Sequence, residues 1–296
     1  RGLEDRPVEF GFGAKGTTLI LNSVVWSASK STGDTASYDL SGWGAEGGLE
    51  LPVGGIGRVG FTVGAFLGLD KDGNQFNSIE TSQYQVGVHW RVNKGNFATL
   101  VRATYARLNF NGERIFDASD LATGAFRRSS TASWGGNLFG LTGAASYTIP
   151  AGKRLSFRPR IAGDYYRLQE NGYNQTGGGA AFDLKVNSRN SDELAVEGSL
   201  TLAYDLHQSS SGASRLRLEL EGGERTILSG TIGSTTATFG TGQSFTLLPE
   251  ERKNGWLGRF RLIGGSTGFT FGAEAGAEDQ AGRLGYTFRA ALQIGW

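Results

Sequence analysis

The chain has 296 residues, with 48 glycines and 5 prolines, and its 29 basic and 28 acidic residues leave a net charge of +1. Glycine is well above its average share of about 7%, and the low proline content excludes a collagen-like or proline-rich chain. The balanced charge gives no electrostatic footprint for nucleic acid. Cysteine is absent, which excludes a disulfide framework and a thiolate metal site. Methionine is absent too, so we expect Arg1 to begin a processed chain or a part of a longer protein.

No stretch approaches the roughly 18 apolar residues of a membrane helix, which leaves a soluble β protein or a membrane β-barrel. Alternation of apolar and other residues, the signal of a half-buried strand, is clearest in 283–296, where the even positions from Leu284 to Trp296 are all apolar. The same division recurs upstream. It predicts strands at 17–30, 37–53, 57–70, 79–93, 96–112, 133–149, 153–168, 191–206, 214–226, 253–265, 267–279 and 282–296.

These segments are much longer than the strands of about 5 or 6 residues in soluble proteins, and they exceed the roughly 9 to 11 residues that cross a bilayer. Which face is apolar stays ambiguous in 17–30 and 133–149. The connections alternate between short ones, such as 54–56 and 94–95, and polar ones that are often long, such as 113–132, 169–190 and 227–252. Outer-membrane barrels have short periplasmic turns and long extracellular loops. We therefore expect an all-β fold with a single closed antiparallel transmembrane barrel of about twelve strands, and both termini in the periplasm.

The charged face of each strand, taken alone, would suit the solvated surface of a soluble protein, and a two-sheet soluble sandwich stays open. Over twelve strands, a barrel with its apolar face toward outer-membrane lipid satisfies both faces and leaves no open edge. In that arrangement the charged side chains line the lumen. The residues assigned to it are Arg58, His89, Arg91, Arg102, Arg154, Arg158, Arg160, Glu197, Asp205, Arg215, Arg217, Glu219, Glu221, Arg259, Arg261, Glu274, Arg283 and Arg289.

Several segments carry a family resemblance: Val25-Trp26 with Gly42-Trp43-Gly44 near the start, Asn111-Gly112 in the middle, and Phe157-Arg158-Pro159 farther on. Over nearly its whole length the chain resembles an autotransporter β-domain. That resemblance implies a twelve-stranded outer-membrane barrel that anchors, and helps to export, its own N-terminal passenger. The family usually has a helix through the pore before the first strand. Residues 1–16 contain Pro7 and four glycines and read poorly as helix, so we assign them to a linker or lumen segment, and 17–296 to the barrel domain.

The last strand ends on an aromatic residue. Phe288, Leu292, Ile294 and Trp296 share one face of it. They are either lipid-facing side chains with an interfacial anchor or, as the resemblance to outer-membrane barrels implies, a C-terminal signal that the barrel assembly machinery reads.

Other motifs argue against a cofactor. Residues 11–16 fit GxGxxG but precede a β-like stretch rather than a helix, and Asp70 and Asp72 begin like a calcium loop that has Gln75 where glycine belongs. The sequence therefore predicts no cofactor, no metal and no catalytic residue. Residues 264–268 fit GxSxG in a strand–strand turn, and Ser266 with His207 leaves an outer-membrane hydrolase as a remote alternative. A stand-alone channel, or a barrel subunit that binds another surface protein, is the nearer alternative.

Overall fold

The computed structural model describes residues 16–31, 37–74, 76–118, 126–209, 214–240, 242–249, 254–266, 268–280 and 283–296. The assignment of 1–16 to a linker or lumen segment, the GxGxxG stretch and Gln75 therefore lie largely outside the described residues. Within those residues, no helix is long and apolar enough to cross a membrane.

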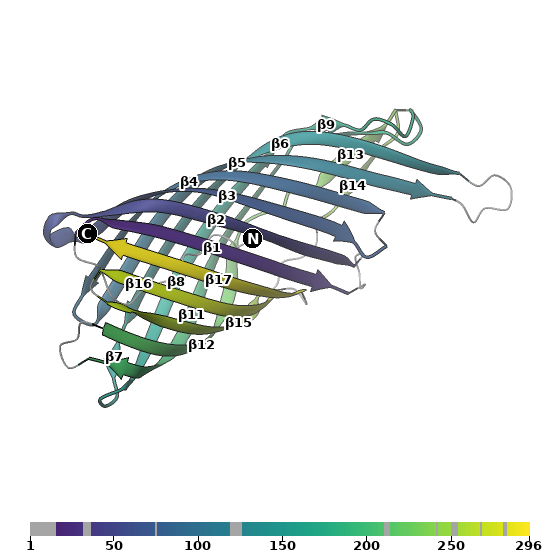
Figure 1. Cartoon of the computed structure of the whole chain (residues 1–296). Coiled ribbons are helices and arrows are strands. Elements are labelled where there is room, and N and C mark those ends of the chain that lie inside the picture. Colours follow the sequence, from purple (N-terminus) through teal and green to yellow (C-terminus); the bar gives the residue numbers. More distant parts are fainter. Residues whose placement is uncertain are drawn as a thin grey trace.

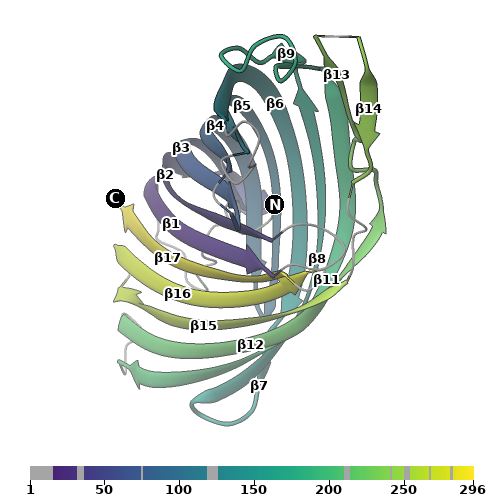
Figure 2. The same ribbon diagram turned by 90° about the vertical axis from the view of Figure 1, so that its right-hand side faces the viewer.

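Twelve long antiparallel strands make up the barrel. Their bounds are β1 (Thr18–Lys30), β2 (Tyr38–Pro52), β3 (Arg58–Asp72), β4 (Asn77–Lys94), β5 (Phe97–Asp117), β6 (Arg127–Tyr147), β8 (Leu155–Glu170), β11 (Arg189–Gln208), β12 (Ser214–Ser229), β15 (Gly255–Ser266), β16 (Phe269–Gln280) and β17 (Arg283–Gly295). Each strand pairs with the next, and β1 pairs with β17 along its length, from Thr18 opposite Gly295 to Ser29 opposite Leu284. This pairing closes the sheet (Figures 1 and 2), so the prediction of a closed twelve-stranded barrel is confirmed.

The two ends of the barrel differ. At one end, here called the turn end, the strands are joined by short connections such as the 3-10 turn Gly54–Ile56 and the segment that holds β7 (Ile149–Pro150). The other end, here called the loop end, carries the connections 171–188 and 230–254 (Figure 1). Both described chain ends lie at the turn end, where the Trp296 amide donates a hydrogen bond to the carbonyl of Thr17 (3.1 Å).

The predicted loops are more ordered than the sequence suggested. Strands β5 and β6 continue through most of the predicted loop 113–132, because their cross-strand pairing runs out to Asp117 opposite Arg127. The two long loops contribute a separate four-stranded sheet in the order β14-β13-β10-β9, made of β9 (Tyr173–Asn174), β10 (Leu184–Val186), β13 (Thr235–Phe239) and β14 (Ser244–Leu247). Backbone groups of these loops are thus paired between loops distant in sequence.

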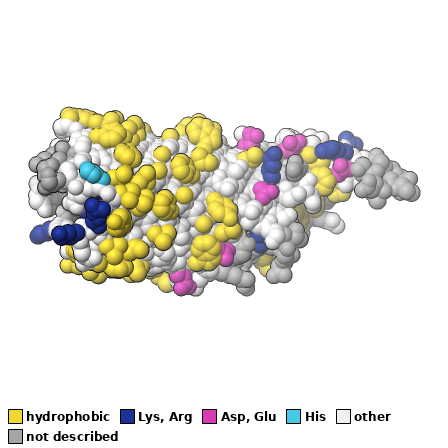
Figure 3. Space-filling model, turned by 60° about the horizontal axis from the view of Figure 1, so that its bottom comes forward, with side chains coloured by type: hydrophobic (Ala, Val, Ile, Leu, Met, Phe, Trp, Pro, Cys, Tyr) yellow, Lys and Arg dark blue, Asp and Glu magenta, His cyan; other side chains and the backbone are white. Residues whose placement is uncertain are grey.

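Alternation sorts the side chains of each strand onto two faces. On β4, Val86 and Val88 are exposed (45% and 53%), whereas Gln83 and Gln85 are buried. An exposed apolar side chain in a closed barrel lies on the outer wall, and a buried polar one lies inside. In Figure 3 apolar side chains cover much of the middle of the visible face, and charged ones gather toward the two ends. Such an outer surface suits lipid.

Alternation could not place β1 and β6, because both faces of these strands carry large residues. In the structure Val24 and Trp26 of β1 are buried against Phe66 of β3. On β6, Trp134 and Leu138 are buried with Phe110 and its neighbours on β5. The interior toward the loop end is therefore partly apolar, and the charged interior described next lies mostly nearer the turn end.

Candidate functional site: the charged interior

Glu50 of β2 is the centre of one ion-pair cluster. Its side chain is wholly buried and accepts hydrogen bonds from Arg58 Nε (2.6 Å) and Arg91 Nε (2.5 Å), and His89 Nε2 lies 3.1 Å from its Oε1. Gly60, directly opposite Glu50 and His89 on the intervening strand, makes the contact possible. A Cβ on Gly60 would lie 2.2 Å from the His89 ring, so only glycine leaves the two side chains room to meet.

Arg58 also links this cluster to the start of the barrel. Its Nη2 donates to the carbonyl of Gly16 (2.7 Å) and to the hydroxyl of Thr18 (2.6 Å). The chain thus enters β1 beside the charged interior at the turn end.

A second buried ion pair joins β5 to β2. Arg102 of β5 donates a hydrogen bond to Glu46 of β2 across the two intervening strands, β3 and β4. The interior positions between them are small, since Gly64 and Gly87 lie in the path. Asn22 of β1 donates a further hydrogen bond to Glu46 (3.2 Å).

On the other side of the barrel the charges form a ladder. Glu219 of β12, Arg261 of β15, Glu274 of β16 and Arg289 of β17 lie directly opposite one another in consecutive strand pairs. Opposite charges therefore alternate, and Arg261 Nε and Arg289 Nη1 each lie 2.5 Å from Glu274. Arg158 of β8 reaches Glu219 (2.7 Å) from the opposite direction. Removing one member of such a buried pair leaves an uncompensated charge, which costs roughly 3–5 kcal/mol.

A second row lies beside the first. Arg259 of β15 contacts Glu197 (3.1 Å), Glu221 (3.2 Å) and Glu278 (3.3 Å), and Arg160 of β8 also reaches Glu197 (2.8 Å). Arg158 crosses β11, whose interior positions Thr201 and Ala203 are small, whereas the partner of Arg160, Glu197, is on β11 itself. The two rows tie β8 to β17 through side chains as well as through the backbone ladder.

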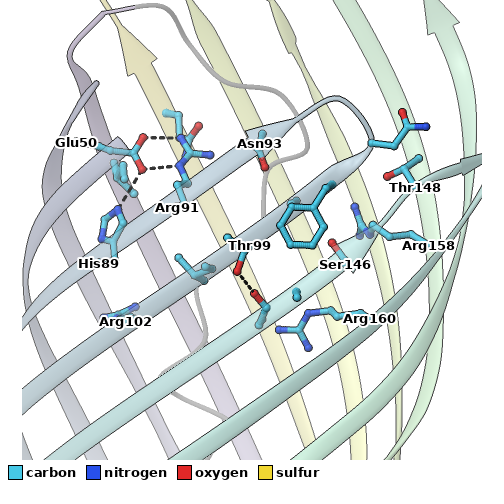
Figure 4. A pocket seen from close by; sticks show the side chains of 18 of the residues that line it. Glu50, His89, Arg91, Asn93, Thr99, Arg102, Ser146, Thr148, Arg158 and Arg160 are labelled. Atoms are coloured by element: carbon cyan, nitrogen blue, oxygen red, sulfur yellow. Dashed lines mark hydrogen bonds and ion pairs between the residues drawn. The ribbon is translucent and has the colours of Figure 1, made fainter. Parts of the chain in front are cut away.

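A cavity of about 150 Å³ lies between the two clusters at the turn end (Figure 4). Glu50, His89 and Arg91 line one side of it, and Arg158 and Arg160 come from the other. The side chains that β6 contributes to the cavity wall, such as Ala144 and Ser146, are small and uncharged. Buried polar atoms of Thr62 and Gln293 at this cavity have no hydrogen-bond partner within the protein. Such atoms call for water, so the arrangement suits a hydrated space with rigid, charged walls.

The structure places most of the residues assigned to the lumen within this charged interior. The buried ones are Arg102, Arg158, Glu197, Asp205, Arg217, Glu219, Glu221, Arg259, Arg261, Glu274 and Arg289; the half-buried ones are Arg58, His89, Arg91, Arg160, Arg215 and Arg283. Arg154 differs, because β8 begins one residue after it and its exposed side chain lies in the turn, where bulk water solvates it.

Several charged residues of the interior were not predicted from the sequence. Glu46 and Glu50 alternate with Leu49 and Leu51 in the predicted strand 37–53, so the same alternation rule could have found them. Glu170 and Arg189, which form a pair at 2.7 Å, fell in a predicted loop, and no local signal marked them. Further examples are Asp164, Glu193, Arg225 and Glu278.

Residues considered for catalysis do not assemble. His207 of β11 and Ser266 of β15 are both exposed, β12 separates their strands, and no hydrogen bond joins them. The Asp72 carboxylate accepts hydrogen bonds from Phe76 and Asn77 of its own turn. Among the described residues, no group of three or more histidine or acidic side chains is arranged to hold a metal ion.

The comparisons with known proteins give the family. The sequence matches the family model of the autotransporter beta-domain over residues 24–276. This chain belongs to the autotransporter β-domain family. Autotransporter β-domains are barrels of the outer membrane, so the charged interior is the inner wall of an outer-membrane translocator barrel.

Solved autotransporter structures share the fold. The translocator domain of autotransporter NalP from Neisseria meningitidis matches with a TM-score of 0.74 at 14% identity, covering 97% of this chain and 90% of that one. The β-domain of the Bordetella autotransporter BrkA matches with a TM-score of 0.63 at 10% identity, covering 94% and 99%. The transport unit of AIDA-I from Escherichia coli gives 0.53 at 8% identity, covering 98% and 93%. A comparison with curated protein sequences finds no match.

The exposed face of β17 carries the residues assigned to the C-terminal signal. Phe288, Ile294 and Trp296 of this autotransporter β-domain are 56%, 37% and 68% exposed, and Leu292 is half-buried. Both the anchor and the signal interpretations need this face accessible.

Proposed function

We propose that this autotransporter β-domain is a non-enzymatic translocator and anchor that holds the C-terminal end of an N-terminal passenger in its lumen. The observation that carries the proposal is the charged cavity at the turn end, beside the point where Arg58 binds the carbonyl of Gly16. A segment that continues upstream from Gly16 starts beside this cavity. With the turn end and both termini in the periplasm and the loop end outside, such a segment reaches the surface by the shortest path through the lumen.

The charge pairs support this role physically. An inner wall whose side chains are paired with one another keeps its shape without an apolar core. Water or a polar peptide in the lumen can then form hydrogen bonds with the polar atoms of the wall that have no partner in the protein. The proposed partners are outer-membrane lipid at the apolar outer face, the barrel assembly machinery at β17, and the passenger in the lumen.

The test is export of a reporter. A small folded reporter fused before Arg1 behind a signal sequence should become accessible to external protease in intact cells. Replacing Ala144 by Trp fills the cavity and should leave the barrel assembled, judged by faster migration of the unheated protein on a gel, while external reporter falls severalfold. Thr226→Trp, outside the cavity on β12, is the control. A reporter that stays in the periplasm on an assembled wild-type barrel contradicts the proposal.

A passive channel is the second candidate, and the cavity between Arg91 and Arg158 is the observation that favours it. Steady ion conductance of the purified full chain in a planar bilayer, together with no reporter export, would select it. Hydrolysis that disappears in the Ser266→Ala/His207→Ala variant would instead support the remote alternative of an enzyme.

A further inference from the structure

The outer wall carries a repeated pattern on two strands that run in the same direction. On β5 the exposed positions from Phe97 through Val101 to Tyr105 are mostly apolar, and the next one is Arg107. On β8 the outward positions lead through Ile161 and Tyr165 to Arg167, so that both strands read Tyr-x-Arg at the edge of the apolar band. Beyond each arginine toward the loop end, the next outward residue is polar and uncharged.

Strand β6 lies between these two arginines and holds the site together. Asn137 is directly opposite Arg107, and Phe139 is directly opposite Arg167. The Asn137 side-chain oxygen accepts hydrogen bonds from Tyr105 Oη (2.9 Å) and Arg107 Nη1 (3.1 Å). One neutral side chain therefore orients both members of the Tyr-x-Arg pair.

The Arg107 guanidinium points away from the apolar band. Its Nη2 lies over Gly135, two residues beyond Asn137 toward the loop end, where an added Cβ would come within 2.7 Å of it. A long cationic side chain that leaves the hydrocarbon and extends toward the head-group region behaves in this way at a membrane interface.

These two arginines differ from those of the interior, where nearly every arginine has a carboxylate partner. Throughout the described parts of the chain, neither Arg107 nor Arg167 takes part in an ion pair, although Asp192 is directly opposite Arg167 on β11. The exposed acidic residue of β5, Glu113, lies farther toward the loop end and is bonded to Ser129. Arg107 and Arg167 are thus exposed cations at the edge of the band, and neither is held in an ion pair within the described residues.

We propose that Arg107 and Arg167, with Tyr105, Asn137 and Phe139, form a binding site for the phosphate groups of a lipid in the leaflet at the loop end. Arginine is suited to the task, because its planar guanidinium donates paired hydrogen bonds to phosphate oxygens. The aromatic side chains supply the surface for the acyl chains just below. With the loop end outside, as proposed above, this leaflet is the outer one; the site itself does not depend on passenger export.

The experiment uses the full chain in detergent and native mass spectrometry with diphosphoryl lipid A as the probe. Wild-type protein should retain one such lipid, and Arg107→Gln/Arg167→Gln should bind it roughly tenfold to thirtyfold more weakly. The control, Arg127→Gln/Arg128→Gln, removes the same charge from the exposed tip of the β5–β6 hairpin and should bind like wild type. Unheated gel migration checks that every variant is folded.

Two further arms define the ligand. The same glycolipid without phosphates should bind wild type and the double variant equally, and millimolar inorganic phosphate should not displace the phosphorylated lipid. Equal affinity of wild type and double variant for diphosphoryl lipid A overturns the proposal. Displacement by inorganic phosphate overturns the lipid assignment in favour of a general anion site. Reporter export by the double variant is read separately, so failure here leaves the translocator role standing.

Discussion

Arg102 and Glu46 form an ion pair across two intervening strands of the barrel, with both side chains buried. The contribution of this pair can be tested by exchanging its two charges. We expect Glu46→Arg or Arg102→Glu alone to reduce the folded fraction strongly, since each puts two like charges together in a poorly solvated place. The double variant Glu46→Arg/Arg102→Glu should recover most of the folded fraction, although Asn22 then faces an arginine. Unheated gel migration after refolding into lipid measures this, and a double variant as poor as the singles would show that the pair itself contributes little.

Glu50 is the acceptor for Arg58, Arg91 and His89, so its loss affects three partners at once. We expect Glu50→Gln to lower the free energy of unfolding by about 3 kcal/mol or more, the scale for a broken buried pair. Urea unfolding in lipid vesicles gives the value. Glu80→Gln, an exposed carboxylate on β4, is the matched control and should stay within about 0.5 kcal/mol of wild type.

The two faces of β6 can be tested directly, because the chain has no cysteine of its own. Ser146 lines the cavity, whereas Leu141 of the same strand is 43% exposed on the outer face. We expect Ser146→Cys in lipid vesicles to react with a charged, water-soluble thiol reagent and Leu141→Cys to resist it, while a lipid-phase reagent shows the reverse preference. Equal labelling of the two positions would contradict the assignment of the faces.

Trp296 distinguishes an assembly signal from a plain anchor. It is exposed at the end of β17, and its backbone amide is bonded to Thr17. We expect deletion of Trp296 to block or slow insertion in cells, with periplasmic degradation, and to impair refolding into pure lipid only mildly. Pulse-chase fractionation and in vitro refolding provide the two readouts. Equal damage in both would leave only the interfacial anchor.

Asp183 anchors the loop 171–188. Partial desolvation raises the pKa of its carboxyl, but hydrogen bonds from Ser130 and the amides of Gly178 and Gly179, together with nearby Arg114, hold the pKa below the ordinary value of 3.8. A lowered pKa in the folded loop means that its contribution is complete above pH 3.8 and is lost as the pH falls farther.

We therefore expect hydrogen exchange of loop 171–188 to be unchanged between pH 7 and 5 after correction for intrinsic rates. Asp183→Asn should accelerate this exchange at neutral pH. Lys185→Gln, an exposed change in the same loop, should not. Unaltered exchange in Asp183→Asn would show that the Asp183 hydrogen bonds do not hold the loop.

The sequence by itself determined the architecture of the barrel. Strand number, strand length and the alternation of short and long connections are local properties, and a period of two along 283–296 assigns the faces of β17 without knowledge of any other strand. The same rule placed most of the interior arginines, and it reaches Glu46 and Glu50 when applied to β2.

Only the tertiary structure decided which charges meet. Glu50 binds Arg58 and Arg91, and Arg102 passes over two strands to Glu46, because the cross-strand register brings Gly60, Gly64 and Gly87 beneath these side chains. Likewise Trp26 and Trp134 lie inside through packing against Phe66 and Phe110, on strands where both faces are apolar enough for lipid. Register and barrel closure join residues far apart in the chain, and no local pattern encodes the free-energy difference between alternative pairings.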